Sequence, residues 1–287
     1  MESFPILIAS GAACPPPKSA EEKQNLLFGS LQGLDSVLVA LSGGADSAYL
    51  AWAANRMLGT SALAVTALSA SFSAHDREQA VSFVQAVRLR HEFIETCEFK
   101  NPRYVANGAD RCYHCKDELF DRMAALASER GFRAIAYGIN ADDTHDFRPG
   151  HRAAKEHRVL APLLDAGLSK EEIRRLSRSA GLPTWDRPAS ACLSSRVPYG
   201  TPVTPGLLAK IERAEAGLRN LGFRQFRVRA HGELARIELA KEELARGLQT
   251  AYSREILAVV RAAGFPFVTI DPEGYRQGSL NSLLKSK

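Results

Sequence analysis

The chain has 287 residues, of which 45% are hydrophobic and 24% charged, so it accommodates one large domain or a medium domain followed by a small one. No apolar run is long enough to span a bilayer, and the N-terminal segment carries Glu2 where a secretory signal has basic residues. The formal net charge of +5 favours anionic partners without separating nucleic acids from nucleotides or phosphates. We therefore expect a cytoplasmic chain that does not enter a membrane.

The cysteines point to metal or redox chemistry. There are five of them, at Cys14, Cys97, Cys112, Cys115 and Cys192. An odd number in a chain of this length does not match a secreted disulfide framework. A reducing compartment is the better interpretation, and it agrees with the cytoplasmic expectation.

Short apolar runs alternate with amphipathic segments in the first part of the chain. The runs predict strands at 36–41, 62–70, 92–95 and 133–137. The segments predict helices at 47–58, 75–89 and 115–129. This alternation indicates an α/β fold with a doubly wound parallel sheet. Ligands are then expected at the carboxyl ends of the strands, where Ser42 and Gly138 fall.

The pattern changes after Trp185. A proline-rich link over 187–205 leads to a helix with an apolar face formed by Leu207, Ile211, Ala214, Leu218 and Leu221. Strands at 224–230 and 234–239, a helix at 241–263 and a strand at 267–271 follow. This order predicts a small α+β domain. We expect an N-terminal extension over 1–20, a first domain over 21–186 and a second over 187–287.

A glycine-rich turn follows the first predicted strand and precedes a helix. It comprises Ser42, Gly43, Gly44, Ala45, Asp46 and Ser47. Glycines let the backbone approach an anion, and the first amides of a helix are unpaired donors. The hydroxyls of Ser42 and Ser47 add donors, and Asp46 can help to hold Mg²⁺. The alternative is an ordinary capped turn.

Cys112 and Cys115 form a CxxC pair at the start of a predicted helix. Unpaired helix amides favour the thiolate, so we expect lowered thiol pKa values there. Together with Cys192, the pair can bind zinc or an iron–sulfur cluster. The alternative is a pair of unligated, packed thiols. Cys14 and Cys97 have no such context and are expected to be inert.

The SGGADS turn resembles that of the PP-loop ATP pyrophosphatase family. The resemblance implies cleavage of ATP to AMP and pyrophosphate, with AMP transferred to a substrate oxygen. It also implies that the adenine lies near the end of the second strand, around Ser69.

Longer stretches resemble one PP-loop subfamily, the LarE sulfur transferases: RCYHCKDELF, GINADDTHDFRPG, WDRPASACLSSRVPYG, FRVRAHGELARIE and IDPEGYRQGSLN. The similarity runs from about Glu21 to Asn281. It implies adenylylation of pyridinium-3,5-biscarboxylic acid mononucleotide and conversion of its carboxylate to a thiocarboxylate, in nickel-pincer nucleotide biosynthesis. One family type sacrifices the cysteine that matches Cys192. The other holds a [4Fe-4S] cluster on three cysteines, and we assign this chain to that type through Cys112, Cys115 and Cys192.

Other site residues carry over from the same resemblance. Lys116 and Arg196 lie beside the cysteines and can stabilise developing charge. Arg227 and Arg229 alternate along a strand, so both face one side, which suits the substrate phosphate or a solvated strand face. Glu215 matches an acidic family position, or is simply exposed. The acidic and basic side chains after the fourth strand serve Mg²⁺ or fix their loop by Asx turns: Asp142, Asp143, Asp146 and Arg148.

Two rival functions remain open at this point. A PP-loop tRNA thiolase would use the basic residues between Lys210 and Arg229 on RNA, but the chain carries no recognisable RNA-binding module. A noncatalytic zinc-binding or nucleotide-sensing protein would not need the intact SGGADS turn. We therefore expect ATP, the pyridinium mononucleotide and a sulfide donor as partners of a homo-oligomer, and not a nucleic acid.

Overall fold

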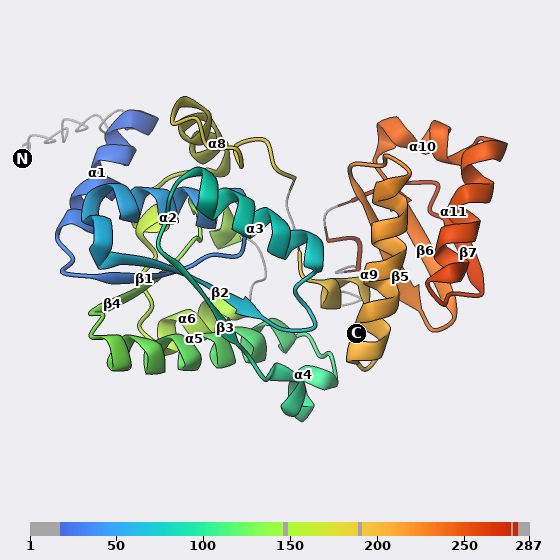
Figure 1. Cartoon of the computed structure of the whole chain (residues 1–287), viewed down its shortest axis with the longest axis horizontal. Coiled ribbons are helices and arrows are strands. Elements are labelled where there is room, and N and C mark those ends of the chain that lie inside the picture. The colour runs from blue at the N-terminus through green and yellow to red at the C-terminus, as the bar shows by residue number, and fades with distance from the viewer. Residues whose placement is uncertain (1–17, 146–148, 189–190, 277, 281–287) are drawn as a thin grey trace, which may run out of the picture.

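The computed structural model describes residues 18–145, 149–188, 191–276 and 278–280. In these residues the chain builds two sheets, one in each half (Figure 1). The first has the order β3-β2-β1-β4, and all its strands are parallel. Its strands are β1 (Val37–Ala40), β2 (Ala62–Leu68), β3 (His91–Glu95) and β4 (Ala134–Tyr137). The predicted α/β class and parallel sheet are confirmed.

Helices cover both faces of this sheet (Figure 1). Val37 and Val39 point into a core with α1 (Ala20–Gln32), α2 (Ala45–Leu58), α3 (Ala74–Ala86) and α8 (Lys170–Ser179). Leu38 and Ala40 point into a second core with α5 (Arg111–Arg130) and α6 (Gly150–Glu156). Side chains alternate between the faces of a strand, so a continuously apolar β1 is what a sheet covered on both sides requires.

Helices α1 and α8 are among those of the first half that were not predicted. Ser19 caps α1 and Ser169 caps α8, each in a capping box with the glutamate three residues later. Lys23 of α1 forms an ion pair of 2.8 Å with Glu172 of α8. The S-x-x-E spacing was the signal in the sequence that would have located both helix starts.

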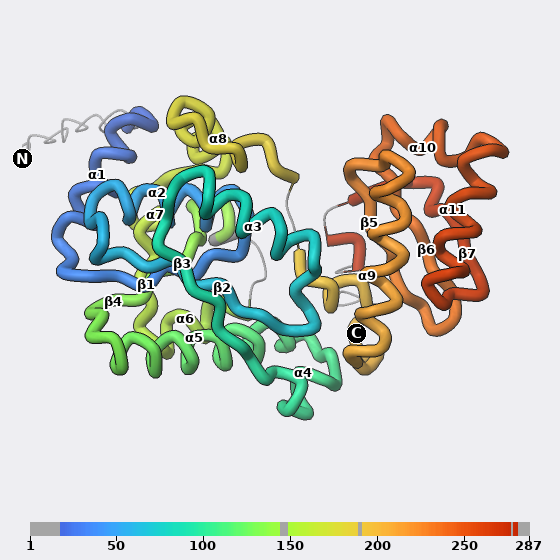
Figure 2. The backbone as a smooth tube through the Cα atoms, viewed as in Figure 1, coloured from blue at the N-terminus to red at the C-terminus, as the bar shows by residue number. Residues whose placement is uncertain are grey.

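The second half is built on β5 (Phe226–His231), β6 (Leu234–Leu239) and β7 (Phe267–Ile270). β5 and β6 are antiparallel, and β7 is parallel to β6. Helices α9 (Pro205–Asn220), α10 (Lys241–Leu248) and α11 (Thr250–Ala262) complete it, and Figure 2 shows this half beside the parallel sheet. The boundary proposed at residue 187 stays a prediction, although Leu193 and Val197 already pack in the core of the second half.

The single helix predicted over 241–263 is wrong. Gln249 adopts an extended conformation, with φ −63° and ψ 141°, and it divides the segment into α10 and α11. Gly247 lets the end of α10 pack closely against β6, because a Cβ at this position would lie 2.3 Å from Cδ1 of Leu239. This tertiary contact leaves no mark in the helical pattern.

Among the described helices, none combines the length and the apolar character needed to cross a membrane.

Candidate active site

The glycine-rich turn joins β1 to α2 at the carboxyl end of the parallel sheet. Gly43 has φ 79°, a conformation that favours glycine, and Gly44 caps α2. The hydroxyls of Ser42 and Ser47 lie 3.0 Å apart, and Ser47 also donates to the Gly44 carbonyl. Gly138, directly after β4, packs against the backbone of Ser47. The turn is therefore held open at the start of a helix, where free amides can meet an anion.

Asp46 lies in this turn with one carboxylate oxygen unsatisfied. Oδ2 accepts a hydrogen bond of 3.0 Å from Asn140. The buried Oδ1 has no hydrogen-bond partner in the part of the chain that the structure describes. Burial raises the pKa of Asp46, against the opposing charge of Lys170. Such a buried carboxylate oxygen beside the glycine-rich turn fits a Mg²⁺ ion, which prefers oxygen ligands.

Basic residues that the sequence analysis missed stand beside the turn. Arg187 donates hydrogen bonds to the Gly43 carbonyl and to Gln79. Arg174 of α8 donates to the Arg187 carbonyl at 2.8 Å, and the charges of Lys170 and Arg174 both act on Asp46. Their spacing in the sequence gives no hint of this, because α8 reaches the turn only through the fold.

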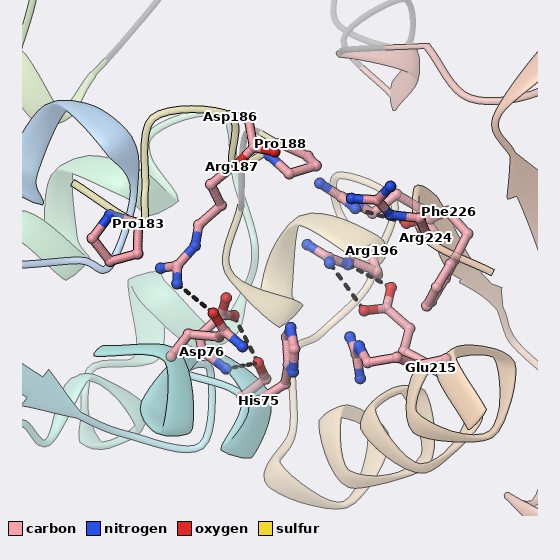
Figure 3. A pocket seen from close by; sticks show the side chains of 14 residues that line it. His75, Asp76, Pro183, Asp186, Arg187, Pro188, Arg196, Glu215, Arg224 and Phe226 are labelled. Atoms are coloured by element: carbon pink, nitrogen blue, oxygen red, sulfur yellow. Dashed lines mark hydrogen bonds and ion pairs between the residues drawn. The ribbon is translucent and has the colours of Figure 1, made fainter. Parts of the chain in front are cut away.

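A hollow of about 260 Å³ opens from Arg187 toward the second half of the chain (Figure 3). Its walls come from the start of α3, the segment around Pro183–Pro188, α9 and β5. The charged side chains in its lining are Asp76, Asp186, Arg187, Arg196, Glu215, Arg219, Arg224 and Arg227. Arginines outnumber carboxylates, so the hollow suits an anionic ligand.

Arg196 and Glu215 face one another in this hollow (Figure 3). Both are buried, and the guanidinium binds both carboxylate oxygens, at 2.8 and 3.0 Å. Burial alone would raise the pKa of Glu215, but the charge and hydrogen bonds of Arg196 outweigh it and the pKa lies below its usual value. Arg196 also donates to the Cys192 carbonyl, and Glu215 accepts from the Val228 amide. The exposed alternative for Glu215 is wrong: the pair joins the Cys192 segment to β5.

Arg227 and Arg229 share a face of β5 but have different surroundings. Arg227 lines the hollow and stacks on Tyr275, with 5.1 Å from its Cζ to the ring centroid. Burial and the charge of Arg196 lower the pKa of Arg227. Arg229 does not line the hollow, and its guanidinium binds the fully buried Glu238 at 2.8 Å. Only the first of the two arginines is therefore placed where a ligand of the hollow would reach it.

Ser69 does not line this arginine-rich hollow. With Leu68 and Phe72 it lines a second hollow, of about 430 Å³, beyond the ends of β2 and β3. Its hydroxyl lies 2.8 Å from that of Ser71. The site expected for an adenine near the end of the second strand thus has space beside it.

The three predicted cysteines come from both halves of the chain. α5 begins at Arg111 rather than near Cys115, so Cys112 lies in its first turn and Cys115 in its second. Cys192 is exposed, directly before a 3₁₀ turn that starts at Leu193. Burial, and then the nearness of Cys192 and Glu98, raise the pKa of Cys115 to about 12. The lowered pKa that the helix start predicted is therefore wrong for Cys115, because burial outweighs the helix amides.

Lys116 follows these cysteines on α5. Its charge partly opposes the rise in the pKa of Cys115. Its Nζ lies 5.7 Å from the ring centroid of Phe120. Within the described residues, no group of three or more His, Cys, Asp or Glu side chains has the arrangement of a formed metal site. The three-cysteine metal site stays a prediction.

Sequence comparison shows the family of the chain. A pyridinium-3,5-bisthiocarboxylic acid mononucleotide synthase from Lactiplantibacillus plantarum is 32% identical over 264 residues, which cover 91% of this chain and 95% of the relative. The chain belongs to the LarE family. An uncharacterised protein from Synechocystis sp. is 43% identical over 267 residues, covering 93% of this chain and 98% of the relative. One from Methanocaldococcus jannaschii is 27% identical over 240 residues, covering 84% and 90%. No family model matches the chain.

Membership of the LarE family makes the chain an enzyme rather than a noncatalytic nucleotide sensor. The loop after β4 lies beside the glycine-rich turn, because Asn140 donates to Asp46. Asn140 accepts hydrogen bonds from the amides of Asp142 and Asp143, and Asp142 accepts from the Lys170 amide at 2.8 Å. These bonds are those of a loop fixed by Asx turns. Asp146 and Arg148, like Cys14, lie outside the described residues.

Proposed function

We propose that this LarE-family enzyme is an ATP-dependent sulfur transferase that converts a carboxylate of pyridinium-3,5-biscarboxylic acid mononucleotide into a thiocarboxylate. The observation that carries the proposal is the arginine-lined hollow between the glycine-rich turn and β5, bordered by the segment that holds Cys192. The name of the Lactiplantibacillus plantarum relative supports the substrate. The product serves nickel-pincer nucleotide biosynthesis, and we place the enzyme in the cytoplasm as a homo-oligomer.

The first step activates the carboxylate. A substrate carboxylate oxygen attacks the α-phosphorus of ATP, the bond to pyrophosphate breaks, and an acyl adenylate forms. The amides and hydroxyls of the turn at 42–47 would hold the leaving pyrophosphate, since free donors at a helix start favour an anion. Asp46 would help to hold Mg²⁺ through its unpaired oxygen. The proximity of Lys170, Arg174 and Arg187 supports further neutralisation of the phosphates.

The second step replaces oxygen by sulfur. A sulfur nucleophile attacks the acyl carbon, AMP leaves with the bonding electrons, and a thiocarboxylate remains. A carboxylate is a poor electrophile until its oxygen becomes part of this leaving group. Arg227 would bind the substrate phosphate, because its guanidinium lines the hollow and offers planar paired donors to a phosphate. Arg229 supports that strand through Glu238 rather than from within the hollow.

For the sulfur source we propose a [4Fe-4S] cluster held by Cys112, Cys115 and Cys192. Cysteine thiolates are the ligands that such clusters use, and the charges of Cys192 and Cys112 both act on Cys115. When bound, the cluster would supply sulfide on the iron that lacks a protein ligand. Lys116 and Arg196 would then offset negative charge around the thiols. In the alternative mechanism the exposed Cys192 is itself sacrificed.

Anaerobic purification with iron and sulfide analysis tests this assignment. We expect about four irons per chain, and we expect Cys112→Ala, Cys115→Ala and Cys192→Ala each to lose iron and sulfur transfer together. Cys97→Ala is the matched control, because its thiol contacts Arg122 outside this group, at 3.7 Å. Mass spectrometry after turnover should find Cys192 intact. Dehydroalanine at position 192 with an active Cys112→Ala variant would refute the cluster assignment and support sacrifice.

A further inference from the structure

A buried asparagine joins the two parts of the chain that carry the cysteines. Asn107, between α4 (Pro102–Val105) and α5, is fully buried and has φ 55°, a region in which asparagine is better tolerated than most residues. Its side-chain amide donates to carbonyls about 90 residues further along the chain: Val197 at 3.3 Å, Pro198 at 2.8 Å and Thr201 at 2.9 Å. The backbone carbonyl of Asn107 accepts a hydrogen bond of 2.9 Å from the Gly200 amide.

Arg111 continues this connection toward the thiols. Only 4% of it is exposed. Its Nη1 donates to Oδ1 of Asn107 at 2.6 Å and to the Ser194 carbonyl at 2.8 Å. Its Nη2 lies 3.8 Å from Sγ of Cys112, and its guanidinium faces the Tyr199 ring at 5.9 Å. One planar cation therefore contacts the CxxC helix, the asparagine and the segment that follows Cys192.

We propose that Asn107 and Arg111 form a clasp that positions Cys192 against Cys112 and Cys115. The two residues are positioning residues: they hold the cysteines in place and do not themselves contact the reacting atoms. A guanidinium can do this because its donors lie in a rigid planar fork, so that fixing one partner aligns the others. The Val203 amide, which donates to the Val105 carbonyl at 2.8 Å, reinforces the same contact from the backbone.

The clasp also supplies charge where the proposed function needs it. Three thiolates around an iron–sulfur cluster concentrate negative charge in a partly buried place. Arg111 is buried beside Cys112 and would offset this charge with little screening by solvent. Hydrogen bonds to cluster sulfurs are among the factors that set the reduction potential of such clusters. This part rests on the proposed function, whereas the geometric role of the clasp does not.

Thiol bridging in the iron-free full-length protein tests the geometric role. Dibromobimane becomes fluorescent when it bridges two thiols, and peptide mass spectrometry identifies the pair. In the wild type we expect bridges between Cys192 and the CxxC pair. In Arg111→Met and Asn107→Gly, Cys192 bridging should slow by roughly tenfold, the scale set by a hydrogen bond to a charged group. Bridging between Cys112 and Cys115, which both lie on α5, should not change in Asn107→Gly, and in Arg111→Met it is the reference for any change in the reactivity of Cys112 itself.

The controls separate the clasp from general destabilisation. Arg122→Met removes another arginine of α5 that approaches a cysteine sulfur, that of Cys97, and it should leave Cys192 bridging unchanged. Arg111→Lys keeps the charge but not the fork, so it should not restore bridging. Asn107→Gly retains the freedom to adopt a positive φ and so keeps the test valid if Arg111→Met does not fold. Wild-type bridging of Cys192 in a folded clasp variant would overturn the proposal.

Iron analysis of the same proteins after cluster reconstitution, without thiol bridging, distinguishes this proposal from the proposed function. Reconstituted wild type that binds no iron would refute the cluster, while the bridging rates would still decide whether the clasp exists. Iron bound by the wild type and lost from both clasp variants would support both.

Discussion

A single methyl group added at Gly138 should displace the glycine-rich turn at 42–47. An alanine Cβ at this position would lie 2.7 Å from both the Cα and the amide nitrogen of Ser47, and 3.0 Å from the carbonyl carbon of Asp46. All three neighbours are backbone atoms in the first turn of α2, so no flexible side chain can move aside. Overpacking of this kind costs about 1–3 kcal/mol of unfolding free energy.

The same displacement should weaken ATP binding. The first amides of α2 would hold the pyrophosphate, and a shift approaching 1 Å can reduce turnover by roughly 100-fold. We expect Gly138→Ala to lower the free energy of unfolding in urea and to raise the KM for ATP in a pyrophosphate-release assay. Gly29→Ala is the control: a Cβ added there would meet no described atom within 4 Å, and alanine inside a helix is favoured by about 0.5–1 kcal/mol. A Gly138→Ala enzyme with wild-type stability and ATP KM would refute the reasoning.

Two further predictions concern charged groups. Because burial raises the pKa of Asp46, the native state is more stable with this group protonated, and that stability is lost as pH rises through its folded pKa. Asp46→Asn should therefore unfold at a higher urea concentration than the wild type at neutral pH, and this difference should disappear below the ordinary carboxyl pKa of 3.8. The variant should also release no pyrophosphate. Equal urea midpoints at pH 7 would contradict the raised pKa of Asp46. Arg227→Ala should raise the KM for the pyridinium mononucleotide with little change in stability. Arg229→Ala should lower the free energy of unfolding by about 1.5–3 kcal/mol, because the buried Glu238 loses one charged partner while it keeps Arg236. Equal stability of the two variants would show that their different surroundings do not matter.

Local pattern was sufficient for the parallel sheet and for the position of the glycine-rich turn between β1 and α2. Continuous apolar runs mark strands covered on both faces, so β1, β2 and β4 were located within a few residues. The turn at 42–47 was recognisable because consecutive glycines between a predicted strand and a predicted helix indicate a backbone conformation that other residues rarely adopt. The family could be recognised for the same reason, since its motifs are contiguous.

Tertiary structure alone decided the properties that depend on neighbours distant in the chain. Alternation placed Arg227 and Arg229 on one face of β5, but only packing put Glu238 against one of them and the hollow against the other. A helix start predicts a lowered pKa for Cys115, whereas Cys192 and Glu98 arrive through the fold and burial raises it. Arg187 meets Gly43 across 144 residues. Periodicity reports which way a side chain faces; its environment, and therefore its charge and chemistry, is set by what packs against that face.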